Sequence, residues 1–279
     1  MGIRAELHLK NFGLDYDQPV KFVTSQWGHG TFYTLWRVFW AIFHSVWVVA
    51  SLWVTSDVTT TSSDAAKWFI YLSNWTYLTL TLETCTEAVV LIWTMTKRKD
   101  IISGTANDMP WYFKMQWLLY TIVTSGSFHI SAFYWLIIFK DQTLTPVRVA
   151  IHGINSIYVF LNILITATPL RLYHFIYPVA YGTVYTLFTV VYFCADGTNL
   201  AGEPYIYRVL KWDHLKSTLP IVCISTFVVL PFEHCFVFLL YKLRTFCHKK
   251  QRTKEGKEKH VEANCNAQSQ VLEKDTEDV

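Results

Sequence analysis

Six long apolar windows alternate with short polar connections along the first 241 residues of the chain. A helix needs about 20 mostly apolar residues to cross the hydrocarbon core of a bilayer, and each window reaches that length. A helix also satisfies its own backbone polar groups, which lipid cannot do. The pattern therefore predicts an all-α, polytopic transmembrane helical bundle with about six spans. The windows are 32–54, 68–93, 115–139, 149–168, 172–194 and 219–241.

The composition excludes an ordinary water-soluble globular domain. Of the 279 residues, 52% are hydrophobic, 17% aromatic and only 16% charged, whereas soluble domains carry about 25% charged residues. The basic residues lie beside the apolar windows, so they indicate membrane topology rather than binding to nucleic acid. The six cysteines include no CxxC pair, so we expect no zinc site. Nothing in the sequence indicates another metal or a cofactor.

The distribution of Lys and Arg predicts the orientation of the bundle. In a six-span topology the cluster Lys97-Arg98-Lys99 and the basic residues after Tyr241 fall on the same side, whereas Asp57 and Asp64 fall on the opposite side. Because cytosolic connections are enriched in Lys and Arg, we expect both termini in the cytosol. The pattern suits a plasma membrane or an endomembrane equally well.

The same features divide the chain into three parts. Residues 1–31 form a cytosolic N-terminal segment, 32–241 the six-helix transmembrane domain, and 242–279 a basic then acidic cytosolic tail. The tail is polar and highly charged, so it is expected to be disordered. Cys247 lies in its basic part, where it is either palmitoylated or a plain reduced thiol. The terminal residues Glu277-Asp278-Val279 suit a scaffold protein that binds C-terminal carboxylates.

Polar residues inside the apolar windows are the candidates for function. A charge at the centre of a bilayer costs about 2.5–3.5 kcal/mol, so Glu83 and Glu87 must be protonated, paired or near water. Arg37 and His44 on the first helix are their candidate partners. Two interpretations stay open: the polar groups hold helices together, or they line a cavity that binds an ion, a lipid headgroup or a substrate. The candidate cavity residues are Asn74, Glu83, Glu87, His129, Asn155 and Ser156.

A nucleophile and a base can also be drawn from these helices. The Ser73 hydroxyl on the second window and the His152 imidazole on the fourth are residue types that combine in nucleophilic catalysis. The competing interpretation of His152 is a buried hydrogen-bonding residue, because the sequence shows no third group that would orient its ring.

Several short segments of the chain look like the rolling stone family of multipass membrane proteins. They include Tyr71-Leu72-Ser73-Asn74-Trp75, His152-Gly153-Ile154-Asn155-Ser156-Ile157 and Gly202-Glu203-Pro204-Tyr205-Ile206-Tyr207, and the resemblance runs from about Gln26 to Tyr241. The family is named for an insect protein linked to myoblast fusion. The resemblance implies a six-span membrane protein that acts in fusion or a related process at the cell surface.

A more remote resemblance links these segments to the androgen-induced family of intramembrane hydrolases, which cleave fatty acid esters of hydroxy fatty acids. That family implies a Thr and a His as the catalytic pair. Its Thr position matches Ser73, which keeps a hydroxyl, but its second His matches Asn155. An amide cannot act as a general base near neutral pH, so His152 would have to take over that role.

Three functional hypotheses follow. The leading one is a rolling stone-like membrane protein in cell–cell or myoblast fusion, with no assigned chemistry. The rival is an intramembrane lipid-ester hydrolase that uses Ser73 and His152 on a lipid substrate. The third is an ion or proton pathway through Glu83 and Glu87, although the chain lacks the repeated halves and broken helices typical of transporters.

Overall fold

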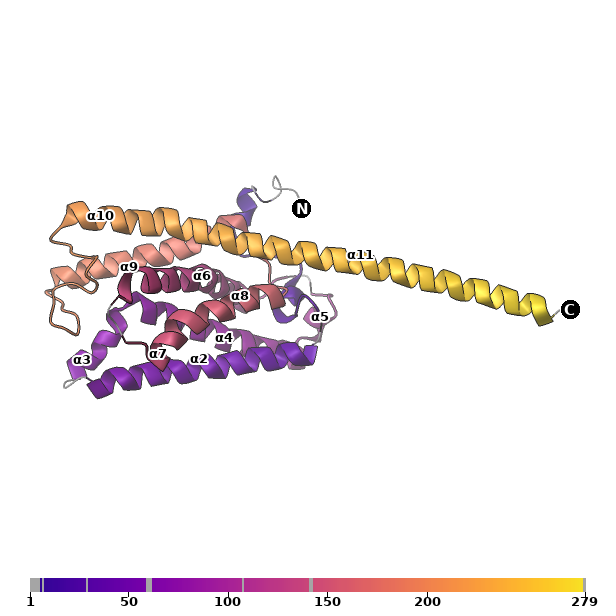
Figure 1. Cartoon of the computed structure of the whole chain (residues 1–279), viewed down its shortest axis with the longest axis horizontal. Helices are drawn as coiled ribbons and strands as arrows, with labels where there is room; N and C mark the ends of the chain where they lie inside the picture. Colours follow the sequence, from indigo (N-terminus) through magenta and orange to yellow (C-terminus); the bar gives the residue numbers. More distant parts are fainter. Residues whose placement is uncertain are drawn as a thin grey trace.

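The structure is a computed structural model that describes residues 6, 8–28, 30–58, 62–106, 108–140 and 143–277. Side chains are described for these residues apart from 56–58, 62–63 and 257–277. The described part is a bundle of long helices whose axes run in roughly one direction (Figure 1). The predicted all-α fold is therefore confirmed.

Six helical stretches in the described part are long and apolar enough to cross a membrane, and each overlaps one predicted window. Three of them contain a π-helical turn, in which the backbone bonds run from residue i to i+5. In order they are α2 (Gly30–Val58), α4 (Leu72–Lys97), α6 (Trp111–Phe133) with η4 (Tyr134–Ile138), α7 (Pro146–Val149) with η5 (Ala150–Ile154) and α8 (Asn155–Ile165), η6 (Leu172–Phe175) with α9 (Ile176–Cys194), and α10 (Leu215–Ile224) with η7 (Ser225–Val229) and α11 (Leu230–Glu277).

Short helices fill the connections. They are η1 (Leu9–Phe12) and η2 (Pro19–Val23) before α2, α3 (Ser62–Ala66) and η3 (Lys67–Ile70) before α4, and α5 (Lys99–Ile102) before α6. We call the end of the bundle that carries residues 195–214 the distal end. The opposite end, where α2 begins and α11 leaves the bundle, is the proximal end (Figure 1).

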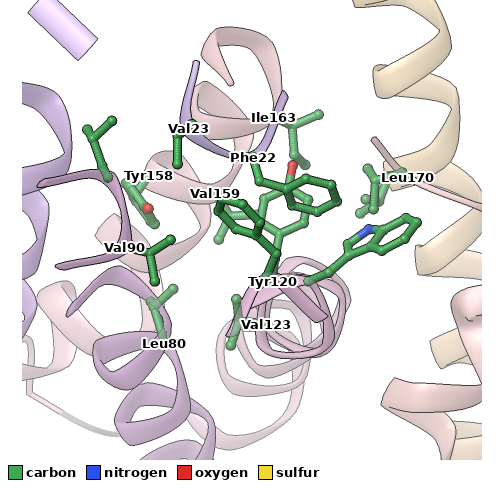
Figure 2. Packing of buried hydrophobic residues seen from close by; sticks show 14 of the residues in the cluster. Phe22, Val23, Leu80, Val90, Tyr120, Val123, Tyr158, Val159, Ile163 and Leu170 are labelled. Atoms are coloured by element: carbon green, nitrogen blue, oxygen red, sulfur yellow. The ribbon is translucent and has the colours of Figure 1, made fainter. Parts of the chain in front are cut away.

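α6 is the central helix, since it contacts α4, α8, α9 and α11, whereas α2 packs mainly against α4. A compact apolar cluster surrounds α6, with Tyr120 and Val123 meeting Leu80, Val90 and Val159 (Figure 2). Polar side chains on these helices are turned inward, and His44 and Gln116 are fully buried. Many large apolar side chains, such as Leu187 and Phe232, are exposed instead. This distribution is expected of a protein whose outer surface contacts lipid.

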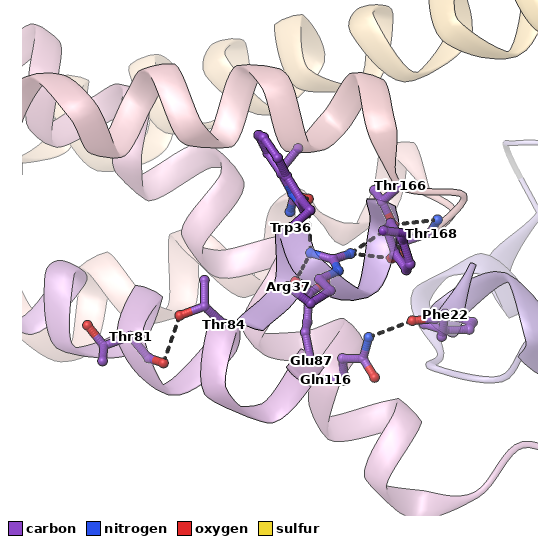
Figure 3. Close-up of polar contacts among 11 residues, drawn as sticks. Phe22, Trp36, Arg37, Thr81, Thr84, Glu87, Gln116, Thr166 and Thr168 are labelled. Atoms are coloured by element: carbon purple, nitrogen blue, oxygen red, sulfur yellow. Dashed lines mark hydrogen bonds and ion pairs between the residues drawn. The ribbon is translucent and has the colours of Figure 1, made fainter. Parts of the chain in front are cut away.

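The N-terminal segment folds back onto the proximal end rather than hanging free. Phe22 is buried against α6, and its carbonyl accepts a 2.9 Å hydrogen bond from Gln116 Nε2 (Figure 3). Residues 24–26 pair with the end of α8 through backbone bonds of 2.8 Å and 2.9 Å. Arg171 donates to the carbonyls of Gly13 and Asp15, both at 2.7 Å. The N-terminal segment thus forms a plug that helps to close the proximal end of the bundle.

The sixth helical stretch extends beyond its predicted window, and the disorder expected of the tail stays a prediction. α11 continues as a helix to Glu277 and leaves the bundle at the proximal end (Figure 1). Lys and Glu are the most frequent residues in this stretch, and both have high helix propensity. The preceding transmembrane turns also supply the helix nucleus, which is the unfavourable step of helix formation. Of the predicted C-terminal motif, Asp278 and Val279 lie outside the described residues.

One residue assigned to the tail by its charge belongs to the core. Arg244 is 1% exposed, and its guanidinium donates to the carbonyls of Ile163, Thr166 and Thr168. These carbonyls lie at and beyond the end of α8, where a helix leaves acceptors without intrahelical partners. Arg244 therefore caps α8 and ties it to α11.

The substitution Arg244→Gln should lower the free energy of unfolding by at least about 1.5 kcal/mol, because it removes charged hydrogen bonds and leaves buried carbonyls unpaired. Unfolding in mixed micelles, followed by tryptophan fluorescence, measures the change. Arg252→Gln, an exposed position on the same helix, is the matched control and should leave stability unchanged. Equal stability of the two variants would contradict the capping role.

Candidate functional site

A cavity of about 870 Å³ runs inward from the distal end of the bundle. Its walls come from α4, α6 and α9, from the turns η4, η5 and η7, and from the connection between α9 and α10. Sites for small molecules have volumes of about 300–1,000 Å³ and are largely apolar with a few convergent polar groups. The cavity has this character, so it is the candidate functional site.

All three π-helical turns border the cavity. Tyr134 in η4, His152 in η5, and Ser225 and Thr226 in η7 are lining residues. A π turn inserts one extra residue into a helix, which widens it and redirects the side chains that follow, and such turns are frequent at functional sites. Pro220 also lies inside α10, where it interrupts the normal backbone bonding just before η7.

Positive charge gathers where the distal connections reach the cavity. Lys140, Arg148 and Arg208 come from three separate segments, and all three line it. Glu203 is the one carboxylate among the described lining residues. It accepts hydrogen bonds from Asn199 Nδ2 at 2.8 Å and from the Tyr205 hydroxyl at 2.9 Å, and these two bonds lower the pKa of Glu203. Among the described lining residues, the cationic side chains therefore outnumber the carboxylates.

Farther from the connections the wall is mostly apolar. Ile122 and Ile130 of α6 and Leu230 of α11 line this part. Gly182 of α9 lies close to η7 and to the start of α11, since a methyl group on it would lie 3.5 Å from Thr226 Cγ2 and 3.0 Å from Leu230 Cδ1. The cavity thus combines a cationic distal region with an apolar inner region.

Three polar side chains are aligned along one wall. The Ser225 Oγ lies 3.0 Å from His129 Nε2, and His129 Nδ1 lies 3.0 Å from Glu233 Oε2. Ser225 and His129 line the cavity, and the Glu233 side chain is 12% exposed behind them. With Nδ1–H donating to the carboxylate, Nε2 is free to accept the serine proton. The arrangement is a serine, a histidine and a carboxylate in consecutive contact.

A second serine and histidine pair lies between the same two helices, α6 and α11. Ser125 Oγ is 3.1 Å from His234 Nδ1, and His234 Nε2 is 2.9 Å from the Arg171 carbonyl. Both side chains are fully buried, and neither lines the cavity. This pair has the geometry of a contact that joins helices.

The predicted catalytic pair, Ser73 and His152, does line the cavity. Among the described residues no hydrogen bond joins the two side chains. The His152 ring stacks on Tyr134 with centroids 3.6 Å apart, while Ser73 lies beside Tyr207. The Tyr207 hydroxyl accepts from the Leu72 backbone at 3.0 Å, and burial raises the pKa of Tyr207 to about 12. A direct proton transfer between Ser73 and His152 has no support in this arrangement.

Glu83 and Glu87 lie outside the cavity, in a separate buried network between α2, α4 and α8. Arg37 forms an ion pair with Glu87, as the sequence led us to expect (Figure 3). Arg37 also donates to Asn162 Oδ1 at 2.9 Å. Glu83 is 0% exposed and lies beside Glu87. His44, the other candidate partner, instead contacts the Tyr77 hydroxyl at 3.1 Å.

The remaining predicted residues make contacts within the bundle. Asn155 Oδ1 accepts a 3.1 Å hydrogen bond from Ser131 Oγ, and Ser156 Oγ donates to the Ser127 carbonyl at 3.0 Å. These bonds join the start of α8 to α6. Asn74 donates to the Trp68 carbonyl at 2.7 Å, at the start of α4. None of the three is a lining residue, so of the six predicted cavity residues the cavity includes only His129.

Sequence reasoning missed Ser225 and did not place Glu233 at a site. The two residues are eight positions apart, a spacing that in a regular helix places them about 80° apart around the axis. The π turn between them changes this angle, and no pattern of residue types in the chain predicts the turn.

The chain matches the family model described as "Protein rolling stone" over residues 2–253. It is also similar to the protein rolling stone of Drosophila melanogaster, with 30% identity over 252 residues that cover 86% of this chain and 88% of the relative. No solved structure matches the chain. Six apolar helices and a match over nearly the whole sequence lead to one conclusion: the chain is a multipass membrane protein that belongs to the rolling stone family.

Proposed function

We propose that this rolling stone family protein binds an amphiphilic lipid with an anionic headgroup in the distal cavity. The observation that carries the proposal is the cavity itself, with Lys140, Arg148 and Arg208 at its distal region and an apolar wall farther in. Of the cavity residues predicted from the sequence, this cavity includes His129.

The charges favour an anion over a cation or a neutral headgroup. Three cationic side chains from separate segments line the cavity, and the one carboxylate among the described lining residues is already bonded by Asn199 and Tyr205. Cationic donors bind phosphate or carboxylate oxygens through charge-assisted hydrogen bonds, which are about twice as strong as neutral ones. The apolar wall then suits a hydrocarbon chain, which favours an apolar environment over water by about 0.8 kcal/mol per methylene group.

Neutralising the distal cations should weaken the binding of an anionic amphiphile. For each of Lys140→Gln, Arg148→Gln and Arg208→Gln we expect about a tenfold rise in the dissociation constant of a dansyl-labelled fatty acid, because one charged hydrogen bond is lost. Fluorescence titration of the protein in phosphatidylcholine nanodiscs measures it.

Lys216→Gln is the matched control, since Lys216 is an exposed distal cation that does not line the cavity. Its dissociation constant should equal that of the unsubstituted protein. Equal affinities for all four variants would refute the assigned headgroup site.

We further propose that the proximal end faces the cytosol, so that the distal cavity opens toward the extracellular side or an organelle lumen. The proximal end carries the cluster Lys97-Arg98-Lys99 and the basic part of α11. This asymmetry follows the positive-inside rule. Lys140, Arg148, Arg208, Lys211 and Lys216 lie at the other end, where the cavity accounts for three of them.

Single cysteines test the orientation in a variant whose native cysteines are replaced by serine. Ser103→Cys reports on the proximal end and Asp213→Cys on the distal end, because both positions are exposed. An impermeant maleimide should modify Ser103→Cys only after digitonin treatment of the cells. Modification of this position in untreated cells would reverse the proposed orientation.

The resemblance that we noted to a protein linked to myoblast fusion supports a role in cell–cell fusion. We propose that occupancy of the cavity is needed for that role. Loss of the protein in a fusing cell line should then lower the fraction of nuclei in multinucleate cells, and the unsubstituted chain should restore it. Expression of a triple variant with Lys140, Arg148 and Arg208 changed to Gln should restore much less. Full rescue by this variant, at equal surface expression, would show that fusion does not depend on occupancy of the cavity.

A further inference from the structure

We propose that Ser225, His129 and Glu233 form a catalytic triad that hydrolyses an acyl ester held in the distal cavity. The proposal deepens the proposed function, since it rests on the cavity binding an amphiphile. It differs from the Ser73 and His152 hypothesis in its nucleophile, its base and its orienting group.

The three side chains occupy the positions that ester hydrolysis by a nucleophilic serine requires. A nucleophilic serine needs a base within hydrogen-bond reach, and the base needs a third group on its other nitrogen. His129 meets both conditions, with 3.0 Å to Ser225 Oγ at Nε2 and 3.0 Å to Glu233 Oε2 at Nδ1. The carboxylate fixes the tautomer that leaves Nε2 unprotonated toward Ser225, and it stabilises the imidazolium that forms on proton transfer.

The π turn η7 creates this alignment. Ser225 is its first residue, and Glu233 follows eight positions later on the same continuous helix. At about 100° per residue, eight regular steps would place the two side chains about 80° apart. A π turn absorbs one residue, so the pair spans roughly seven steps and returns to within about 20° of one line. Both side chains can therefore face His129 from one helix.

The second serine and histidine pair shows which features distinguish the triad from a packing contact. Ser125 and His234 lie between the same helices, but a backbone carbonyl occupies the other His234 nitrogen, and the pair does not line the cavity. Ser225 and His129 have a carboxylate partner and a cavity for substrate. The Ser125 and His234 pair therefore serves as a comparison within the same protein: it represents a packing contact, whereas Ser225, His129 and Glu233 represent the reactive arrangement.

The chemistry balances with water as the only co-reactant. Ser225 Oγ attacks the ester carbonyl carbon while its proton passes to His129 Nε2. The C–O bond to the alcohol breaks, and His129 returns the proton to the leaving oxygen. Water then attacks the acyl-Ser225 ester, again losing a proton to His129, which passes it to Ser225 Oγ as the carboxylic acid leaves.

The position of the triad sets the substrate class. Ser225 lies ten residues after Leu215, the first residue of α10, which places it about 15 Å from the distal end of that helix at 1.5 Å per residue. Lys140, Arg148 and Arg208 lie closer to that end. The substrate is therefore an acyl ester of an amphiphile, with its anionic group toward the cations and its ester carbonyl deeper in the cavity.

A fluorophosphonate probe tests the nucleophile on the purified full chain in nanodiscs. Serine attacks its phosphorus and displaces fluoride, so mass spectrometry should find the adduct on Ser225. Ser225→Ala should remove the labelling, and His129→Gln should slow it by about 10²–10⁴-fold, the usual contribution of a general base. Glu233 is a positioning residue: Glu233→Gln should slow labelling, and Glu233→Asp, which keeps the carboxylate, should recover part of the rate.

Ser125→Ala is the matched control, because Ser125 bonds a histidine outside the cavity, and its labelling rate should be unchanged. Each variant is first shown to run as the unsubstituted protein in size-exclusion chromatography. Labelling that persists in Ser225→Ala overturns the proposal, and labelling lost in Ser73→Ala but kept in Ser225→Ala moves the nucleophile to the other wall.

Turnover is measured as oleic acid released from 1-oleoyl lysophosphatidate and from 1-oleoylglycerol, two esters that differ in the anionic headgroup. Release should be about tenfold faster from the lysophosphatidate, and Ser225→Ala should abolish it. Binding of the dansyl fatty acid without labelling or release would leave the proposed function standing and remove the triad. Labelling of Ser225 without binding would remove the headgroup site and keep the nucleophile.

Discussion

Lipid offers no hydrogen bonds, and this constraint shapes the whole structure. Polar side chains on the spans are therefore turned toward one another. Arg37 pairs with Glu87, Ser131 with Asn155, and His129 with Glu233, each pair from different helices. In a soluble protein such groups would gain little from meeting, since water satisfies them equally well. Here the same contacts determine which helix faces lie inside, and they leave the outer surface to apolar side chains.

The sequence predicted what depends on length and hydropathy. All six windows became helical spans, because about 20 mostly apolar residues have few alternatives in a bilayer. The Arg37 and Glu87 pair was expected for a related reason: a charge within a span is expensive unless another charge on a neighbouring helix meets it. The first inference needs only the composition of a single helix. The second needs only two neighbouring helices and the free-energy cost of a charge in lipid.

The candidate site was harder to predict from the sequence, because it depends on irregularities in the helices that the residue types do not indicate. Serine in a helix can bond its own preceding turn, so the hydroxyl of Ser225 gave no signal within its span. The π turn that lies between Ser225 and Glu233 is likewise not predicted by the residue types of the span. Arg244 was misplaced in the tail for a comparable reason, since one cation in a basic run gives no indication that it caps a distant helix. Of the predicted pair, Ser73 and His152 do reach the cavity, but as separate parts of its wall.

The N-terminal plug has a consequence for the synthesis of the protein. Residues 24–26 pair with the end of α8, and Arg171 holds the carbonyls of Gly13 and Asp15. These partners are translated some 140 residues after Ser25, whose hydroxyl bonds the Ile165 carbonyl. The opening of the chain therefore leaves the ribosome long before its binding surface exists, and it docks only after four helices have entered the membrane. Closure of the proximal end is a late step of assembly, and the first residues to be made are among the last to find their places.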